Sequence, residues 1–235
     1  MFGYYYGGSG YTLVLITALL SIIASLKVNS TFSKYSKVRT ARNLTAEQAA
    51  RSILDANGLH NVRIESVSGN LTDHYDPRAN VIRLSDSVRT STSVAAVGVA
   101  AHEAGHAVQH AVGYAPIKLR NTLVPVANIG SMAGPYLILI GLLLSSSFSS
   151  VLLNIGIWFF AAAVLFQIVT LPVEFNASSR AIKALDEGMY LEGDEIPKVK
   201  KVLGAAAMTY VAAAAVSVAN LLRFILLAGG RRRND

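Results

Sequence analysis

The sequence predicts a mostly α-helical membrane protein with a small additional unit of mixed helices and strands. Of its 235 residues, 52% are hydrophobic and only 15% are charged, whereas a soluble domain usually carries about 25% charged residues. Three apolar segments are long enough to cross, as helices, the roughly 30 Å of hydrocarbon in a bilayer. Between the first two of them, residues 27–120 have the polar and apolar patterning of a soluble domain.

Composition also excludes several other classes of protein. The chain has no cysteine, which excludes a disulfide scaffold, a thiolate-bound zinc or iron–sulfur cluster, and a thiol nucleophile. It has no low-complexity tract and no glycine period, which excludes long disorder and a collagen-like chain. The net charge is +7, but no RNA- or DNA-binding motif accompanies it, and we expect no nucleic-acid partner.

The three apolar segments are residues 11–26, 123–144 and 151–171. Tyrosine is favoured at the level of the lipid headgroups, and the outer edge of the first segment holds Tyr4, Tyr5, Tyr6 and Tyr11. Only residues 145–150 separate the second segment from the third, so these two predict a helical hairpin. The spacing of Gly130 and Gly134 favours close packing of its helices.

Basic residues predict the orientation of these helices, because Lys and Arg are enriched in cytoplasmic loops. They follow the first segment, precede the second and follow the third: Lys27, Lys34, Lys37, Arg39, Arg42, Lys118, Arg120, Arg180 and Lys183. Residues 145–150 carry none. We therefore expect the N-terminus outside, and residues 27–120 and 173–202 in the cytoplasm. Residues 1–10 lack the basic charge of a cleaved signal peptide, so we expect the first segment to remain as an anchor.

A fourth apolar segment, residues 204–227, is compatible with two arrangements. It is rich in Ala and then in Leu, it contains Arg223, and basic clusters lie before it and after it. If it spans the bilayer, Arg231, Arg232 and Arg233 end outside, against the usual charge rule. If it stays inside, a long apolar helix must pack on the polar unit or on the membrane surface.

Residues 28–120 predict a helix, a small sheet and a second helix. Thr45 and Gln48 have the spacing of a capping box that opens a helix, which Gly58 ends. Residues 61–67, 71–76 and 79–84 have strand patterns separated by turn residues. We expect residues 79–84 to form an edge strand to which an extended peptide could add. A helical pattern then covers residues 94–112.

The second of these helices contains His102-Glu103-Ala104-Gly105-His106, an H-E-x-x-H motif. Residues four apart share one helix face, so His102 and His106 can bind one tetrahedral zinc ion. Glu103 can reach a water molecule on the open metal position and act as its general base. Zinc lowers the pKa of such a water to about 7 and polarises a scissile carbonyl. The pattern therefore predicts metal-assisted hydrolysis with one zinc ion per chain.

A catalytic zinc needs a third protein ligand, and Glu174 is the strongest candidate. It lies where the third apolar segment ends, on the same side of the membrane as the two histidines. The alternative for Glu174 is a charge at a helix N-terminus, favourable to the helix dipole. Asp73, Asp76 and Asp86 are weaker candidates. His110 lies about 12 Å from His102 along a straight helix, so we expect it to pack or to orient a ligand.

Several neighbouring polar residues have more than one possible role. His74 and Tyr75 could line the cleft or stabilise an oxyanion, although a pair on a strand is more often structural. Asn176, Ser178 and Arg180 follow Glu174 at helical spacing and could orient metal ligands.

The stretches LTDHYDPRANVIRLSD, VAAVGVAAHEAGHAVQH and LPVEFNASSRA resemble the YugP-type neutral zinc metallopeptidases of bacterial membranes. That family is related at fold level to HtpX-type membrane proteases and other gluzincins. The resemblance implies a membrane-anchored zinc endopeptidase with a small zincin-type α+β catalytic unit that faces the cytoplasm. It also implies that His102, His106 and Glu174 bind the zinc and that Glu103 is the base. The chain departs from many gluzincins at Ser178, where they carry Asp.

We therefore expect an enzyme that cleaves protein or peptide substrates at the cytoplasmic face of a bacterial cell membrane, with the bilayer as its other partner. One alternative is an intramembrane site-2-type protease, for which the Leu185-Asp186-Glu187-Gly188 run would supply an Asp ligand. Another is an inactive metal-binding scaffold.

The expected segments are an anchor (1–27), the catalytic unit (28–120), the hairpin (121–172), a cytoplasmic segment with the third ligand (173–202), and the last apolar helix with its basic tail (203–235).

Overall fold

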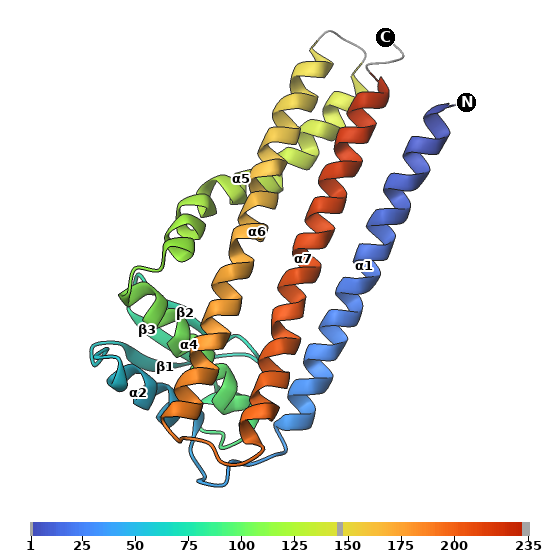
Figure 1. Cartoon of the computed structure of the whole chain (residues 1–235). Coiled ribbons are helices and arrows are strands. Elements are labelled where there is room, and N and C mark those ends of the chain that lie inside the picture. Colours follow the sequence, from blue (N-terminus) through green and yellow to red (C-terminus); the bar gives the residue numbers. More distant parts are fainter. Residues whose placement is uncertain (1, 145–147, 232–235) are drawn as a thin grey trace. The chain divides into compact units, whose positions relative to one another are not determined.

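The computed structural model describes residues 2–144 and 148–231, with side chains for residues 11–144 and 148–229. Helices dominate the described chain (Figure 1). The strands of one small sheet follow the second helix in the sequence and precede the third. The elements are α1 (Phe2–Tyr35), α2 (Ala46–Ala56), β1 (Arg63–Val67), β2 (His74–Asp76), β3 (Val81–Ser85), α3 (Asp86–Arg89), α4 (Val94–Ala111), α5 (Ala115–Leu143), α6 (Ser149–Glu187) and α7 (Glu195–Arg231). The predicted mostly α-helical fold with a small mixed unit is confirmed.

Four of the helices are long and apolar enough to cross a membrane: Tyr11–Tyr35, Ala115–Leu143, Ser149–Glu187 and Glu195–Gly229. The fourth belongs to α7, so residues 204–227, which the sequence left open, form a candidate span by length and composition. The predicted anchors Tyr4, Tyr5 and Tyr6 lie outside the described side chains. Residues 145–147 and the basic residues Arg232 and Arg233 lie outside the described chain.

The chain divides into two compact units. The helical unit comprises Met1–Ala24, Lys118–Leu171 and Thr209–Asp235, and the mixed unit comprises Ser25–Ile117 and Pro172–Met208. Helices α1, α5, α6 and α7 each contribute one part to each unit. The mixed unit therefore holds the H-E-x-x-H motif and Glu174 together, although Glu174 follows His102 by 72 residues in the sequence.

Small residues bring α5 and α6 together within the helical unit. A Cβ atom at Gly130 would overlap the carbonyl group of Phe159, and one at Gly134 would lie 3.1 Å from the carbonyl oxygen of Gly156. Such contacts leave no room for larger side chains, and small residues allow close approach in membrane helices. The expected packing role of Gly130 and Gly134 agrees with this geometry.

Helix α7 packs in the same unit. Ala228 forms a buried cluster with Ile138 of α5 and Leu153 of α6. The guanidinium group of Arg223 lies 4.1 Å from the ring centroid of Tyr11 on α1. A cation over an aromatic face is stabilised by the ring quadrupole, which gives this charged residue a favourable contact among apolar helices.

In the mixed unit, α2 begins and ends as predicted. The side chain of Thr45 accepts a hydrogen bond from the N–H of Gln48 at 3.2 Å, and the side chain of Gln48 accepts one from the N–H of Thr45 at 3.0 Å. Gly58 follows the helix with φ +72°, a conformation that favours glycine. Buried side chains of α2, including Ile53 and Leu54, share one core with α4. The predicted capping box is confirmed.

The sheet has the order β1-β3-β2, with β1 parallel and β2 antiparallel to β3. The expectation that residues 79–84 form an edge strand is wrong, because β3 is the central strand. Val81, Ile82 and Leu84 of β3 are fully buried. The hydrophobic residues of this strand therefore lie in the core and not at an exposed edge. Strand β2 lies at an edge of the sheet and contacts α4, the helix that carries the H-E-x-x-H motif.

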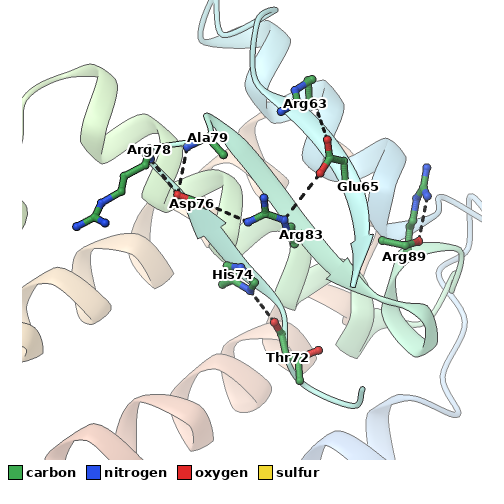
Figure 2. A network of polar contacts seen from close by, with 10 residues as sticks. Arg63, Glu65, Thr72, His74, Asp76, Arg78, Ala79, Arg83 and Arg89 are labelled. Atoms are coloured by element: carbon green, nitrogen blue, oxygen red, sulfur yellow. Dashed lines mark hydrogen bonds and ion pairs between the residues drawn. The ribbon is translucent and has the colours of Figure 1, made fainter. Parts of the chain in front are cut away.

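Polar side chains link β2 and β3, as Figure 2 shows around Arg83. Arg83 donates to Asp76 at 2.9 Å and lies 3.8 Å from Glu65. The backbone N–H groups of Arg78 and Ala79 also donate to Asp76, at 2.9 and 3.2 Å. These bonds, that of Arg83 above all, lower the pKa of Asp76. Asp76, weighed above as a metal ligand, therefore holds the turn between the two strands.

Candidate metal centre

Helix α4 presents the three motif residues on one side of the mixed unit. Ser93 caps the helix by accepting a hydrogen bond from the N–H of Ala96 at 3.2 Å. A run of Ala, Gly and Val follows, and most of these small residues are buried. Small side chains let neighbouring elements approach this helix closely. His102 and His106 lie one turn apart, with ring centroids separated by 4.6 Å.

Glu174 reaches the histidines from helix α6. Pro172 lies inside this helix without ending it, although proline removes one backbone donor and often breaks helices. Glu174 is therefore an interior residue of a long helix, and the alternative of a charge at a helix N-terminus is wrong. Glu174 is almost wholly buried, with 3% of the residue exposed. A buried carboxylate is costly unless it is paired or coordinated.

The three side chains meet in one cluster. Glu174 Oε2 lies 3.3 Å from His102 Nε2 and 3.5 Å from His106 Nε2, and the possible ligand atoms of the three residues all lie within 4.8 Å of one another. Ligands bound tetrahedrally to zinc at about 2.0–2.2 Å are separated by about 3.3–3.5 Å. The spacing and the donor set, two imidazoles and one carboxylate, therefore fit zinc.

Electrostatics in the cluster also favour a cation. Burial acts to lower the pKa of His106, but the Glu174 carboxylate, together with Glu103 and Gln109, outweighs burial, so the pKa of His106 is raised. The carboxylate thus favours positive charge at the place where the Nε2 atoms converge. A metal ion bound there would satisfy the same preference while leaving the imidazoles neutral, as metal ligation requires.

Glu103 lies beside the cluster and is tied to the edge of the sheet. Its Oε2 atom accepts a hydrogen bond from the backbone N–H of Tyr75 on β2, at 2.9 Å. Only 8% of Glu103 is exposed, and burial raises the pKa of its carboxyl group, against the opposing effect of His102 and His106. A carboxylate whose pKa is raised is a stronger proton acceptor.

Tyr75 and His110 have structural contacts. Their rings meet edge to face with centroids 5.5 Å apart, and the Tyr75 hydroxyl donates to Asn80 at 3.1 Å. His110 is not among the residues of the cluster, in agreement with the expectation that it packs. His74 is exposed, with Nδ1 2.8 Å from the carbonyl oxygen of Thr72 (Figure 2).

Both histidines of the cluster have a polar partner at Nδ1. Ser178 Oγ lies 3.1 Å from His102 Nδ1, so Ser178 contacts the site although many gluzincins carry Asp there. Gln109 Oε1 lies 3.0 Å from His106 Nδ1. Sequence reasoning missed Gln109. Its position three residues after His106, on the same face of a helix lined by small apolar residues, is the signal that could have found it.

The other carboxylates considered above have different partners or positions. Asp73 accepts hydrogen bonds from the backbone and hydroxyl of Ser85, the shorter at 2.7 Å. Asp86 lies in the first turn of α3. Asp186 is exposed and follows Glu174 by 12 residues on α6, which is about 18 Å along a helix axis. The structure does not bring Asp186 to the cluster, which weighs against the site-2-type alternative.

A glycine inside the motif permits the approach of α4 to α6. A Cβ atom at Gly105 would lie only 2.6 Å from the backbone oxygen of Ala177, three residues beyond Glu174. Neither backbone can move aside as a flexible side chain would. Gly105 therefore sets the distance between the helix that carries the histidines and the helix that carries Glu174.

We expect Gly105→Ala to destabilise the mixed unit and to weaken metal binding. Alanine is a better helix former by about 1 kcal/mol, but overpacking against a backbone costs about 1–3 kcal/mol and separates the ligands. Thermal unfolding and zinc affinity of the detergent-purified protein measure both effects. Gly204→Ala is the matched control, because a Cβ atom there meets nothing within 4 Å. Equal thermal stability and equal zinc affinity of the two variants would contradict the role assigned to Gly105.

Comparison with known proteins gives a consistent result. A model of the family described as "putative neutral zinc metallopeptidase" matches residues 10–229. The chain is also 48% identical over 226 residues to the "putative membrane protease YugP" of Bacillus subtilis (strain 168), with 95% of this chain and 99% of that protein covered. No solved structure matches the chain.

Proposed function

The chain belongs to the family of neutral zinc metallopeptidases, and we propose that it cleaves peptide bonds of protein substrates at the cytoplasmic face of a bacterial membrane. The observation that carries this proposal is the convergence of two imidazoles and one buried carboxylate beside Glu103. Protein hydrolysis is consistent with a site that has a metal-binding cluster and a separate proton acceptor.

In this proposal, His102, His106 and Glu174 hold one zinc ion per chain. When bound, zinc would supply Lewis-acid polarisation of the substrate carbonyl and lower the pKa of a water molecule at its open position. Glu103 would take the proton from the attacking water and pass it to the leaving amine. The hydrogen bond from the Tyr75 N–H holds this carboxylate beside the cluster, so little reorganisation is needed to use it.

We place the substrate along β2. The N–H of Tyr75 donates to Glu103. It therefore points away from β3, toward the outer edge of β2. An extended peptide that added to this edge would lie next to the proton acceptor, and strand addition is a common mode of peptide recognition. This mode requires an extended backbone, so we propose unfolded or membrane-proximal segments as substrates.

Cleavage of an unfolded protein by the detergent-purified enzyme tests the proposal. We expect cleavage by the zinc-loaded protein, loss of cleavage after removal of the metal by a chelator, and recovery when zinc is restored. A zinc-loaded protein that cleaves none of a set of unfolded substrates would favour the metal-binding scaffold. Cleavage that persists after complete metal removal would contradict a zinc-dependent mechanism.

The proposed topology has the N-terminus outside and the mixed unit in the cytoplasm. The basic residues that follow the first span and precede the second support it. With four spans, both termini and the α5–α6 turn would lie on the outer side, and the Arg-rich tail would then be an exception to the charge rule. The other basic residues outweigh this tail in the proposal because they lie on one side of three of the spans.

Thiol labelling checks this topology, because the chain has no cysteine of its own. We expect a membrane-impermeant thiol reagent to label Ser150→Cys, at the exposed start of α6, in intact cells. The same reagent should label Ser68→Cys, in the exposed loop between β1 and β2, only after the cells are opened. The reverse pattern would place the mixed unit outside and contradict the proposed orientation.

A further inference from the structure

We infer that Gln109 is a positioning residue that fixes the orientation and the tautomer of His106 for metal binding. This inference rests on the proposed zinc site. The Gln109 side chain has no exposed surface, and all its polar contacts lie within the mixed unit. Its Oε1 atom lies 3.0 Å from His106 Nδ1, while its Nε2 atom donates to the Val173 carbonyl at 2.8 Å and to Asn176 Oδ1 at 3.0 Å.

Groups of fixed polarity determine which way this amide faces. The Val173 carbonyl can only accept a hydrogen bond, so the Gln109 atom beside it must be the NH2 group. Arg180 can only donate, and its Nε atom lies 2.8 Å from the Asn176 side chain, so the Asn176 atom there must be the oxygen. That oxygen accepts the second hydrogen of the Gln109 amide. Both amide orientations are therefore fixed.

The fixed amide in turn selects the protonation pattern of the ring. Gln109 presents its oxygen to His106, so His106 Nδ1 must carry a hydrogen and donate it. In the neutral ring, Nε2 then has a free lone pair, and this is the atom 3.5 Å from Glu174. A neutral imidazole with its lone pair at Nε2 is the form that binds a metal. Partners of this kind commonly orient metal-ligating histidines.

His102 lacks an equivalent constraint. Its Nδ1 partner is the Ser178 hydroxyl, which can either donate or accept, so this contact is compatible with both tautomers. Gln109 differs in a second way, because it bonds the backbone of Val173, the residue directly before Glu174. One side chain therefore positions the ligand on α4 and links it to the segment of α6 that supplies the other ligand.

Two substitutions of similar size separate positioning from general packing. Gln109→Met removes the acceptor for His106, and we expect zinc affinity to fall about 10–100-fold, the usual effect of losing such a partner. Gln109→Glu keeps an acceptor for His106 Nδ1 but loses the donors to Val173 and Asn176. We expect this variant to lose thermal stability while its zinc affinity stays within a few-fold of the wild-type value.

Competition with a chelator of known affinity measures zinc binding in detergent, and thermal unfolding of the same samples measures stability. Leu54→Ala, in the buried core and away from the cluster, is the control that should lose stability and keep zinc affinity. Equal zinc affinity of Gln109→Met and the wild type would overturn the inference alone. Parallel losses of affinity and stability in both Gln109 variants would also overturn it. A wild-type protein that binds no zinc would instead overturn the proposed function.

Discussion

Glu174→Gln is expected to reduce bound zinc from one ion per chain to nearly none, and to abolish peptide cleavage with it. The substitution keeps the size of a side chain of which only 5% is exposed. It removes the only carboxylate of the cluster and leaves two imidazoles, whereas catalytic zinc sites use three protein ligands. Metal analysis after exhaustive dialysis of the detergent-purified variant measures the loss.

Asp186→Asn is the matched control for this experiment, since it makes the same chemical change on the same helix at an exposed position. We expect it to retain zinc and activity. The opposite pattern, with zinc lost in Asp186→Asn and kept in Glu174→Gln, would favour the site-2-type alternative. Thermal unfolding of both variants distinguishes loss of the ligand from loss of the fold.

Glu103→Gln is expected to keep zinc and to slow peptide cleavage by at least about 100-fold, because general acid–base catalysis contributes about 10²–10⁴-fold. The amide oxygen of glutamine can still accept the hydrogen bond from Tyr75, so the local fold is retained. An amide cannot take up the proton of the attacking water. Initial rates of cleavage, compared at equal zinc content, measure the effect.

Ordinary cleavage by Glu103→Gln at equal zinc content would contradict the role of Glu103 as general base. Loss of zinc in this variant would show that Glu103 supports the metal instead. Ser178→Ala is a useful comparison, because it removes a contact to His102 without changing the proton acceptor. We expect it to affect zinc affinity more than the cleavage rate of the loaded enzyme.

Much of the candidate site could be predicted because its chemistry is local in sequence. The spacing of His102 and His106 places both on one face wherever the chain is helical. Glu174 required a different argument, its position at the end of the third apolar segment on the same side of the membrane as the two histidines. The structure brings these three residues together, and their roles as zinc ligands remain a prediction.

The parts that could not be predicted depend on contacts between distant segments. Strand patterns identified the sheet, but β3 became its centre through pairing with both neighbours, and the pattern of a single strand does not specify its partners. The third apolar segment was predicted to end at residue 171, yet the helix that contains it continues through Pro172 to Glu187. Gln109 gained significance only when Val173 and Asn176 were placed beside it.

The most direct test of the central claim is anomalous scattering at the zinc absorption edge, measured on crystals of the active, zinc-loaded protein. The account predicts one strong peak per chain within bonding distance of His102 Nε2, His106 Nε2 and a carboxylate oxygen of Glu174. A peak at another group of side chains, or an active protein with no peak at these three residues, would contradict it.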